Sequence, residues 1–124
     1  MAKILYVEDI ADNIALAETI VKSQGHEFLP AHTAELGLEL ALSFQPDLIL
    51  LDLGLPDSDG QTLSLCLRNE PSLQDTPILV LTAWPEEVAQ QTVKAYGLDG
   101  YLCKPFSVRK LIEAIDTLLS KRAS

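Results

Sequence analysis

Residues 48–52 of the chain are Leu-Ile-Leu-Leu-Asp, four aliphatic side chains followed at once by an acid. The same arrangement occurs three more times, where an apolar run ends at Glu8-Asp9, at Thr82 and at Lys104. Short, continuously apolar runs bounded by turn residues are typical of parallel strands that are buried on both faces. The sequence therefore predicts a buried parallel sheet in which polar residues follow the carboxyl ends of the strands.

Helix-like segments separate the strand-like segments, and the two kinds alternate five times along the chain. We expect strands at 3–7, 27–31, 47–52, 77–82 and 100–103, and helices at 11–24, 34–43, 61–69, 86–95 and 108–121. The last helix is the clearest, because apolar residues recur at helical spacing from Val108 to Leu119. Alternating strands and helices imply right-handed crossovers and helices on both faces of the sheet. We therefore predict an α/β fold.

Three residues mark the expected ends of helices. Gly25 falls where a helix-terminating glycine would follow the first helix. Ser107 is the expected N-cap of the last helix, and Pro85 is expected in the first turn of the fourth.

The strand ends carry residues with a common chemistry. In an open parallel sheet, ligands bind beyond the carboxyl ends of the strands. If these strands are neighbours, the carboxylates of Glu8, Asp9 and Asp52 meet the Thr82 hydroxyl and the Lys104 ammonium. Clustered carboxylates raise one another's pKa unless a cation neutralises them, and Mg²⁺ prefers such oxygen ligands. The sequence thus predicts a site for a divalent cation and a phosphoryl group.

Taken in order, these motifs resemble a known family. They are Glu8-Asp9, the stretch Asp-Leu-Gly-Leu-Pro-Asp-Ser-Asp-Gly at 52–60, Thr82-Ala83, and Lys-Pro-Phe at 104–106. The chain is similar to the receiver domain of two-component response regulators, of the single-domain chemotaxis type. The resemblance covers essentially the whole chain as one domain, 1–124. It implies a flavodoxin-like (βα)5 fold with strand order 2-1-3-4-5, which periodicity alone does not fix.

The resemblance implies roles for the acidic residues. Asp52 would be the nucleophile and phosphoacceptor, which forms an acyl phosphate. Asp9 and Asp52 would bind Mg²⁺ directly, together with the backbone carbonyl of Gly54. Glu8 would act on the cation through a water molecule.

The resemblance also implies roles for three residues on the last two strands. Lys104 would pair with the incoming phosphoryl group, and Thr82 would donate a hydrogen bond to one of its oxygens. Tyr101 would rotate inward when Thr82 moves toward the phosphate, so Thr82 and Tyr101 would form the switch. The Lys104-Pro105 bond is a candidate cis peptide.

The expected partners follow from the same resemblance. A sensor histidine kinase or phosphotransfer protein would donate the phosphoryl group, and a downstream protein would bind the face made by the fourth helix, fifth strand and fifth helix. The chain would not be an enzyme for an outside substrate, although it would assist its own phosphorylation and dephosphorylation. No segment for an output domain is expected, and the short tail after the last helix favours a stand-alone receiver over one cut from a longer protein.

Composition supports this interpretation. The formal net charge of −9 argues against a direct nucleic-acid surface. No apolar run approaches the roughly 20 residues that a membrane helix needs, and the N-terminus lacks a signal-peptide pattern. We expect a cytoplasmic protein with no membrane partner, in which Cys66 and Cys103 are reduced thiols, buried or half-buried.

Three alternatives have less support. A flavodoxin-like electron carrier needs a Gly-, Ser- or Thr-rich loop after its first strand to hold the flavin phosphate, but residues 8–12 are acidic. A phosphatase of the haloacid-dehalogenase type carries a second Asp two residues after its nucleophile, where this chain has Gly54. An adaptor that binds partners without phosphorylation would not need all five site side chains.

Overall fold

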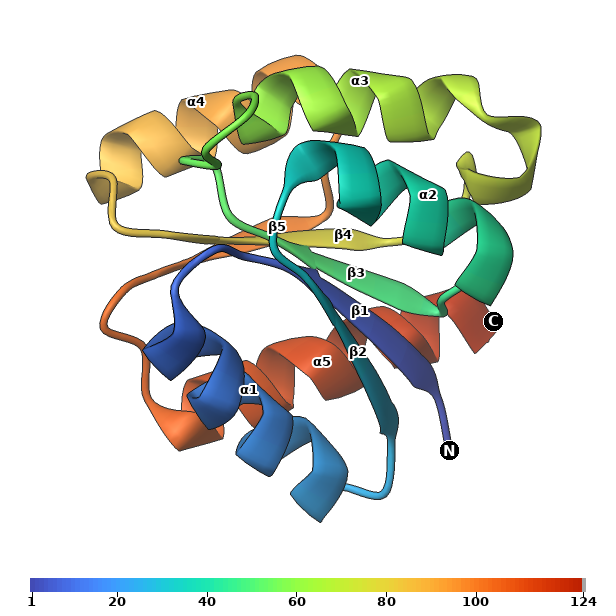
Figure 1. Cartoon of the computed structure of the whole chain (residues 1–124). Helices are drawn as coiled ribbons and strands as arrows, with labels where there is room; N and C mark the ends of the chain where they lie inside the picture. The colour runs from blue at the N-terminus through green and yellow to red at the C-terminus, as the bar shows by residue number, and fades with distance from the viewer. Residues whose placement is uncertain (124) are drawn as a thin grey trace.

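The computed structural model describes residues 1–123, and these form one α/β unit (Figure 1). Strands and helices alternate along the chain as expected. They are β1 Lys3–Val7, α1 Ala11–Ser23, β2 Glu27–Ala31, α2 Ala34–Phe44, β3 Leu48–Leu51, α3 Gly60–Asn69, the 3-10 turn η1 Pro71–Leu73, β4 Ile78–Thr82, α4 Glu86–Tyr96, β5 Gly100–Cys103 and α5 Val108–Ala123.

The sheet has the strand order β2-β1-β3-β4-β5, and every pair is parallel. Helices α1 and α5 cover one face, while α2, α3 and α4 cover the other (Figure 1). In the register, Val7 lies beside Leu51 and Leu51 lies beside Val80, so the carboxyl ends of β1, β3 and β4 reach the same edge. The predicted fold class and strand order are confirmed.

Alternate strand residues supply the two layers of the core. In β1, Leu5 and Val7 pack toward α2, α3 and α4, whereas Ile4 and Tyr6 pack toward α1 and α5. All four residues of β3 are 0% exposed. Burying such a side chain contributes about 1.5–3 kcal/mol, which explains why this sheet must be apolar on both faces.

Several element ends differ from expectation by one or two residues. β4 begins at Ile78 and not at Pro77, because proline has no N–H to donate to the ladder. β3 was expected to begin at residue 47 but begins at Leu48. Asp47 lies just outside the strand, where its carboxylate accepts the Lys3 amide at 2.8 Å. Pro85 is the N-cap of α4, with extended ψ of 147°, so the prediction of a first-turn proline was wrong by one position.

The other two predicted helix signals are confirmed. Gly25 follows the end of α1 with a φ of +82°, a left-handed conformation that favours glycine. The Ser107 hydroxyl accepts the Lys110 amide at 3.0 Å at the start of α5.

The expectation for the thiols was half right. Cys103 is half-buried on β5, but Cys66 is exposed. α3 turns Leu63, Ser64 and Leu67 toward the core, which leaves Cys66 on its solvent face.

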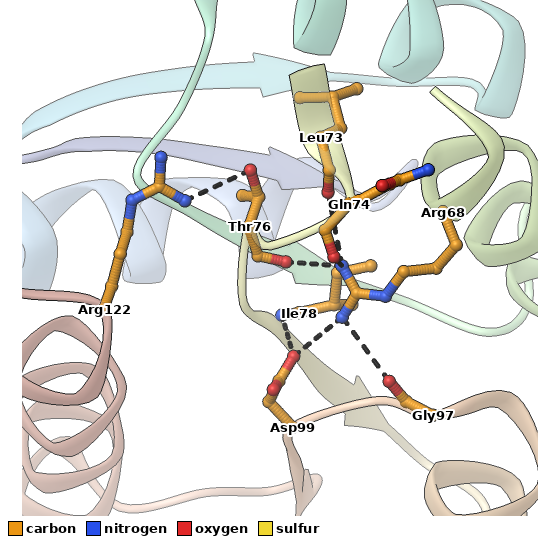
Figure 2. Close-up of polar contacts among 8 residues, drawn as sticks. All are labelled: Arg68, Leu73, Gln74, Thr76, Ile78, Gly97, Asp99 and Arg122. Carbon is orange, nitrogen blue, oxygen red and sulfur yellow. Dashed lines mark hydrogen bonds and ion pairs between the residues drawn. The ribbon is translucent and has the colours of Figure 1, made fainter. Parts of the chain in front are cut away.

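A polar network closes the end of the sheet where β4 and β5 begin (Figure 2). Its centre is the Arg68 guanidinium, which donates to Asp99 at 2.9 Å and to the carbonyls of Leu73, Gln74, Thr76 and Gly97. Asp99 also accepts the Ile78 amide at 2.8 Å, and Arg122 from α5 donates to the Thr76 hydroxyl at 3.2 Å. The guanidinium thereby joins the chain segments around residues 73–76 and 97–99 in one hydrogen-bonded group.

Along residues 1–123, none of the helices combines the length and the apolar character that crossing a membrane would require.

Candidate functional site

The site lies at the carboxyl edge of the sheet, opposite the Arg68 network. Strand pairing continues one residue past the strands there, because the Asp52 amide donates to Val7 O at 3.0 Å and the Lys104 amide donates to Thr82 O at 2.7 Å. These bonds fix the backbone from which the site side chains project. The expected convergence of the acids with Lys104 is therefore present in the structure.

The three acids form a compact group. Single carboxylate oxygens of Glu8, Asp9 and Asp52 all lie within 4.8 Å of one another. Octahedral Mg²⁺ with bonds near 2.1 Å places its ligand oxygens about 3 to 4.2 Å apart, so a small adjustment brings this group to that geometry. The hard, anionic oxygens are also the donors that such a cation prefers. The residues present fit a divalent cation.

Glu8 is the most constrained of the three acids. It is 0% exposed, and its Oε1 accepts from Lys104 Nζ at 2.5 Å, Asn13 Nδ2 at 2.9 Å and the Tyr6 hydroxyl at 3.0 Å. Its Oε2 accepts the amide of Asp9 at 3.1 Å. By contrast, Asp9 is exposed and open to solvent.

Sequence reasoning missed Tyr6 and Asn13. Tyr6 is the one residue of β1 after Lys3 that carries a polar group, and a fully buried hydroxyl needs a hydrogen-bond partner. That requirement is a signal that could have pointed to the neighbouring Glu8. The Asn13 side chain reaches the same carboxylate because Asn13 lies in the first turn of α1, close to the end of β1.

The environment shifts the pKa values of the two buried acids, Asp52 and Glu8, in opposite directions. Burial raises the pKa of Asp52 to about 6; Lys104 opposes this rise, whereas the hydrogen bond and the charge of Glu8 add to it. Burial would also raise the pKa of Glu8, but hydrogen bonds from Lys104, Asp52 and Asn13 outweigh it, and the pKa of Glu8 is lowered. Glu8 is therefore the anion, and Asp52 holds the proton in mildly acidic solution.

Lys104 links the two acids. Its Nζ lies 3.5 Å from Asp52 Oδ1, and its side chain is 14% exposed. The Lys104-Pro105 bond is cis, as predicted. An ammonium at this position neutralises part of the charge of the acidic group and remains accessible to an incoming anion.

The hydroxyl of Thr82 is buried beside the site. Thr82 is 1% exposed, and its Oγ1 accepts the Trp84 amide at 3.0 Å. The next residues of the chain, Ala83 and Trp84, line a cavity of about 710 Å³, and Tyr101 and Lys104 are among its other lining residues.

Tyr101 does not join the cluster. Its hydroxyl donates to Glu86 Oε1 at 2.9 Å and accepts from Gln90 Nε2 at 2.8 Å, so the ring is turned toward α4. Sequence reasoning did not identify Glu86 or Gln90, which reach Tyr101 only because α4 packs beside β5.

The loop after Asp52 approaches it closely. A Cβ at Gly60 would lie 2.6 Å from the carbonyl oxygen of Asp52 and 2.8 Å from Leu53 Cα, so only glycine fits there. Gly54, whose carbonyl was expected to bind the cation, is exposed at the start of this loop. Its amide also helps to lower the pKa of Asp52, against the larger effect of burial.

Comparisons with known proteins agree with this geometry. Residues 4–116 match the model of the response regulator receiver domain. The chain is 29% identical over 116 residues to the polar-differentiation response regulator DivK of Brucella ovis, with 94% of each chain covered.

Solved structures give the same result. A putative response regulator from Chloroflexus aurantiacus is 31% identical, with a TM-score of 0.89 and coverage of 96% of this chain and 98% of that one. The receiver domain of a sensor histidine kinase from Pseudomonas aeruginosa, described with a magnesium ion coordinated in its active-site cleft, is 26% identical with a TM-score of 0.88 and the same coverage. The chain belongs to the response regulator receiver domain family of two-component systems.

Proposed function

We propose that Asp52 accepts a phosphoryl group from a phosphohistidine donor, that the transfer depends on Mg²⁺, and that the phosphorylated domain binds a downstream protein. One observation carries this proposal. A largely buried carboxylate lies 3.5 Å from an ammonium and within 4.8 Å of two further acids, at the edge of the sheet where ligands bind. The magnesium ion described in the Pseudomonas aeruginosa relative supports the choice of cation.

The transfer itself is a displacement at phosphorus. An Asp52 oxygen forms the new bond to phosphorus while the bond to the histidine nitrogen breaks, and that nitrogen keeps the electron pair. Lys104 stabilises the charge on the transferred oxygens, and the Thr82 hydroxyl donates to one of them. Mg²⁺, held by Asp9, Asp52 and the Gly54 carbonyl, would supply further charge neutralisation. Glu8 would orient a metal-bound water, because its own oxygens already accept four hydrogen bonds.

The response to phosphorylation would be a shift between two positions of Tyr101. In the structure the Thr82 hydroxyl accepts the Trp84 amide, and the Tyr101 hydroxyl is bound to Glu86 and Gln90. When Thr82 turns to the phosphate, the ring of Tyr101 would leave α4 and enter the adjoining cavity. A ligand shifts such an equilibrium only by its different affinity for the two states. The surface that changes is formed by α4, β5 and α5, where the downstream protein would bind.

The partners and setting are part of the same proposal. A sensor histidine kinase or phosphotransfer protein supplies the phosphoryl group in the cytoplasm. The net charge of −9 disfavours direct binding to nucleic acid, so the output passes through a protein.

Phosphorylation at Asp52 is tested by intact-mass measurement after incubation with acetyl phosphate and Mg²⁺. We expect the wild type to gain one phosphoryl group and Asp52→Asn to gain none. Asp12→Asn, which alters an exposed acid in the first turn of α1, should behave as wild type. A full phosphate signal in Asp52→Asn would show that Asp52 is not the acceptor.

The raised pKa of Asp52 predicts a pH dependence of stability in metal-free solution. The pKa of Asp52 is about 6 in the folded state and 3.8 ordinarily, so the folded state binds the proton more tightly. The free energy of unfolding of the wild type therefore falls as pH rises from about 4 to about 6. Asp52→Asn avoids this loss and should be more stable at pH 7 by on the order of 1–3 kcal/mol. The difference should shrink toward zero at pH 4.

Urea unfolding of both proteins at pH 4, 6 and 8 measures that difference. Added Mg²⁺ should then stabilise the wild type at pH 8 and have far less effect on Asp52→Asn. A difference between the two proteins that is constant with pH would contradict the assignment of the proton to Asp52.

The bond between Tyr101 and Glu86 predicts the response of the switch to mutation. Removing the acceptor in Glu86→Ala should favour the inward position of Tyr101 by roughly 2- to 10-fold before phosphorylation, which corresponds to one hydrogen bond of about 0.5–1.5 kcal/mol. Ring resonances of Tyr101 in NMR spectra report the change. Glu87→Ala, which removes a neighbouring exposed acid, is the control. Unchanged Tyr101 resonances in phosphorylated wild type would rule out this switch.

A further inference from the structure

The loop between β3 and α3 carries two groups of the proposed cation site. It spans residues 52–59 and includes Asp52 and Gly54. Its two ends are well anchored: Leu53 is 0% exposed, the Gly60 amide donates to Leu53 O at 2.9 Å, and Asp59 accepts the Thr62 amide at 2.7 Å as the N-cap of α3. Between these anchors, residues 54–59 are exposed or half-buried. Half-buried Leu55 packs against the core and Gly54 pairs with Asp59 in an isolated antiparallel bridge, so packing gives least support to the stretch around exposed Pro56 and Asp57.

Asp57 ties the middle of the loop to a different helix. Its Oδ1 accepts the Ala34 amide at 2.8 Å, and its Oδ2 accepts the Glu35 amide at 3.0 Å. These are the first two amides of α2, and neither can have a partner within the helix. Both hydrogen bonds favour the charged form, which lowers the pKa of Asp57.

This contact is separate from the capping that α2 makes for itself. The Thr33 hydroxyl accepts the Leu36 amide at 3.1 Å, so α2 has a conventional N-cap from its own segment. Asp57 also lies outside the group of acids that could hold a metal ion. Because α2 already has its own N-cap, the two hydrogen bonds from Asp57 hold the loop in place as well as the start of the helix.

We propose that Asp57 is a positioning residue for the cation site: by binding the first two amides of α2, it holds the β3–α3 loop where the Gly54 carbonyl can bind the ion together with Asp52. The inference rests on the proposed binding of Mg²⁺. A carbonyl on an untethered loop would have to be ordered when the ion binds, and that ordering weakens the affinity. Asp57 reduces this requirement, because its bonds to α2 add to the Gly54–Asp59 bridge and order the loop beforehand.

The coupling must also act in the opposite direction. If the contact between Asp57 and α2 strengthens binding of the cation, the cation strengthens that contact by the same factor. The first turn of α2 thus senses whether the site is occupied, although Ala34 and Glu35 do not belong to it.

The test compares Mg²⁺ affinity, measured by Trp84 fluorescence or calorimetry, with thermal stability in three variants. Asp57→Ala should weaken Mg²⁺ binding roughly tenfold, as the loss of a residue that orients metal ligands commonly does. Asp57→Asn keeps one acceptor oxygen and should fall between Asp57→Ala and the wild type. Thr33→Ala removes the other cap of α2 without touching the loop, so it should lower the melting temperature and leave Mg²⁺ affinity within about twofold.

A second measurement uses the unmodified protein and does not depend on the folding of any variant. In an NMR titration of the wild type with Mg²⁺, the amide resonances of Ala34 and Glu35 should shift with the same midpoint as the site, and more than that of Leu36. Equal Mg²⁺ affinity in Asp57→Ala and wild type, or equal loss in Thr33→Ala, would overturn the inference and leave the proposed function standing. If the wild type does not bind Mg²⁺, both fail.

Discussion

The structure depends on one electrostatic constraint, which is that three carboxylates share a small space with one ammonium. Glu8 is fully buried, yet its pKa is lowered, because Lys104 and three other donors surround its oxygens. A buried charge is tolerated only with this degree of pairing. Asp52 receives less support, so its pKa rises to about 6. Such a cluster favours any divalent cation that replaces the missing positive charge.

A parallel sheet is the framework that makes the cluster possible. Four neighbouring strands deliver their polar residues to one edge, and apolar side chains on both faces keep the strands fixed relative to one another. At the opposite end of the sheet the charges are balanced, because the Arg68 guanidinium pairs with Asp99 and donates to four backbone carbonyls. One end of the sheet is therefore closed by satisfied polar groups, while the other keeps an excess of negative charge for binding.

The sequence predicted the elements well and their side-chain partners poorly. Apolar runs such as 48–51 locate strands because buried parallel strands leave little choice of residue. The strand order came from the resemblance, since runs of this kind do not say which strands are neighbours. Tyr6 and Asn13 were missed although Glu8 lies only two and five residues away, because an apolar or helical pattern does not show which polar groups meet. Asp57 was missed because its role depends on where another chain segment lies. It contacts a helix that begins 23 residues earlier. Pro85 and Cys66 were misplaced because a single residue's type does not fix its position on a helix.

The Lys104→Met variant tests the central claim of charge imbalance most directly. It removes the only ammonium among these described site residues and keeps an unbranched apolar chain. At pH 8, above the wild-type Asp52 pKa of about 6, calorimetry should show tighter Mg²⁺ binding than in the wild type, because the cation then has no positive charge competing with it for the carboxylates. The same variant should accept phosphate from acetyl phosphate much more slowly. Unchanged or weaker Mg²⁺ binding would contradict the account.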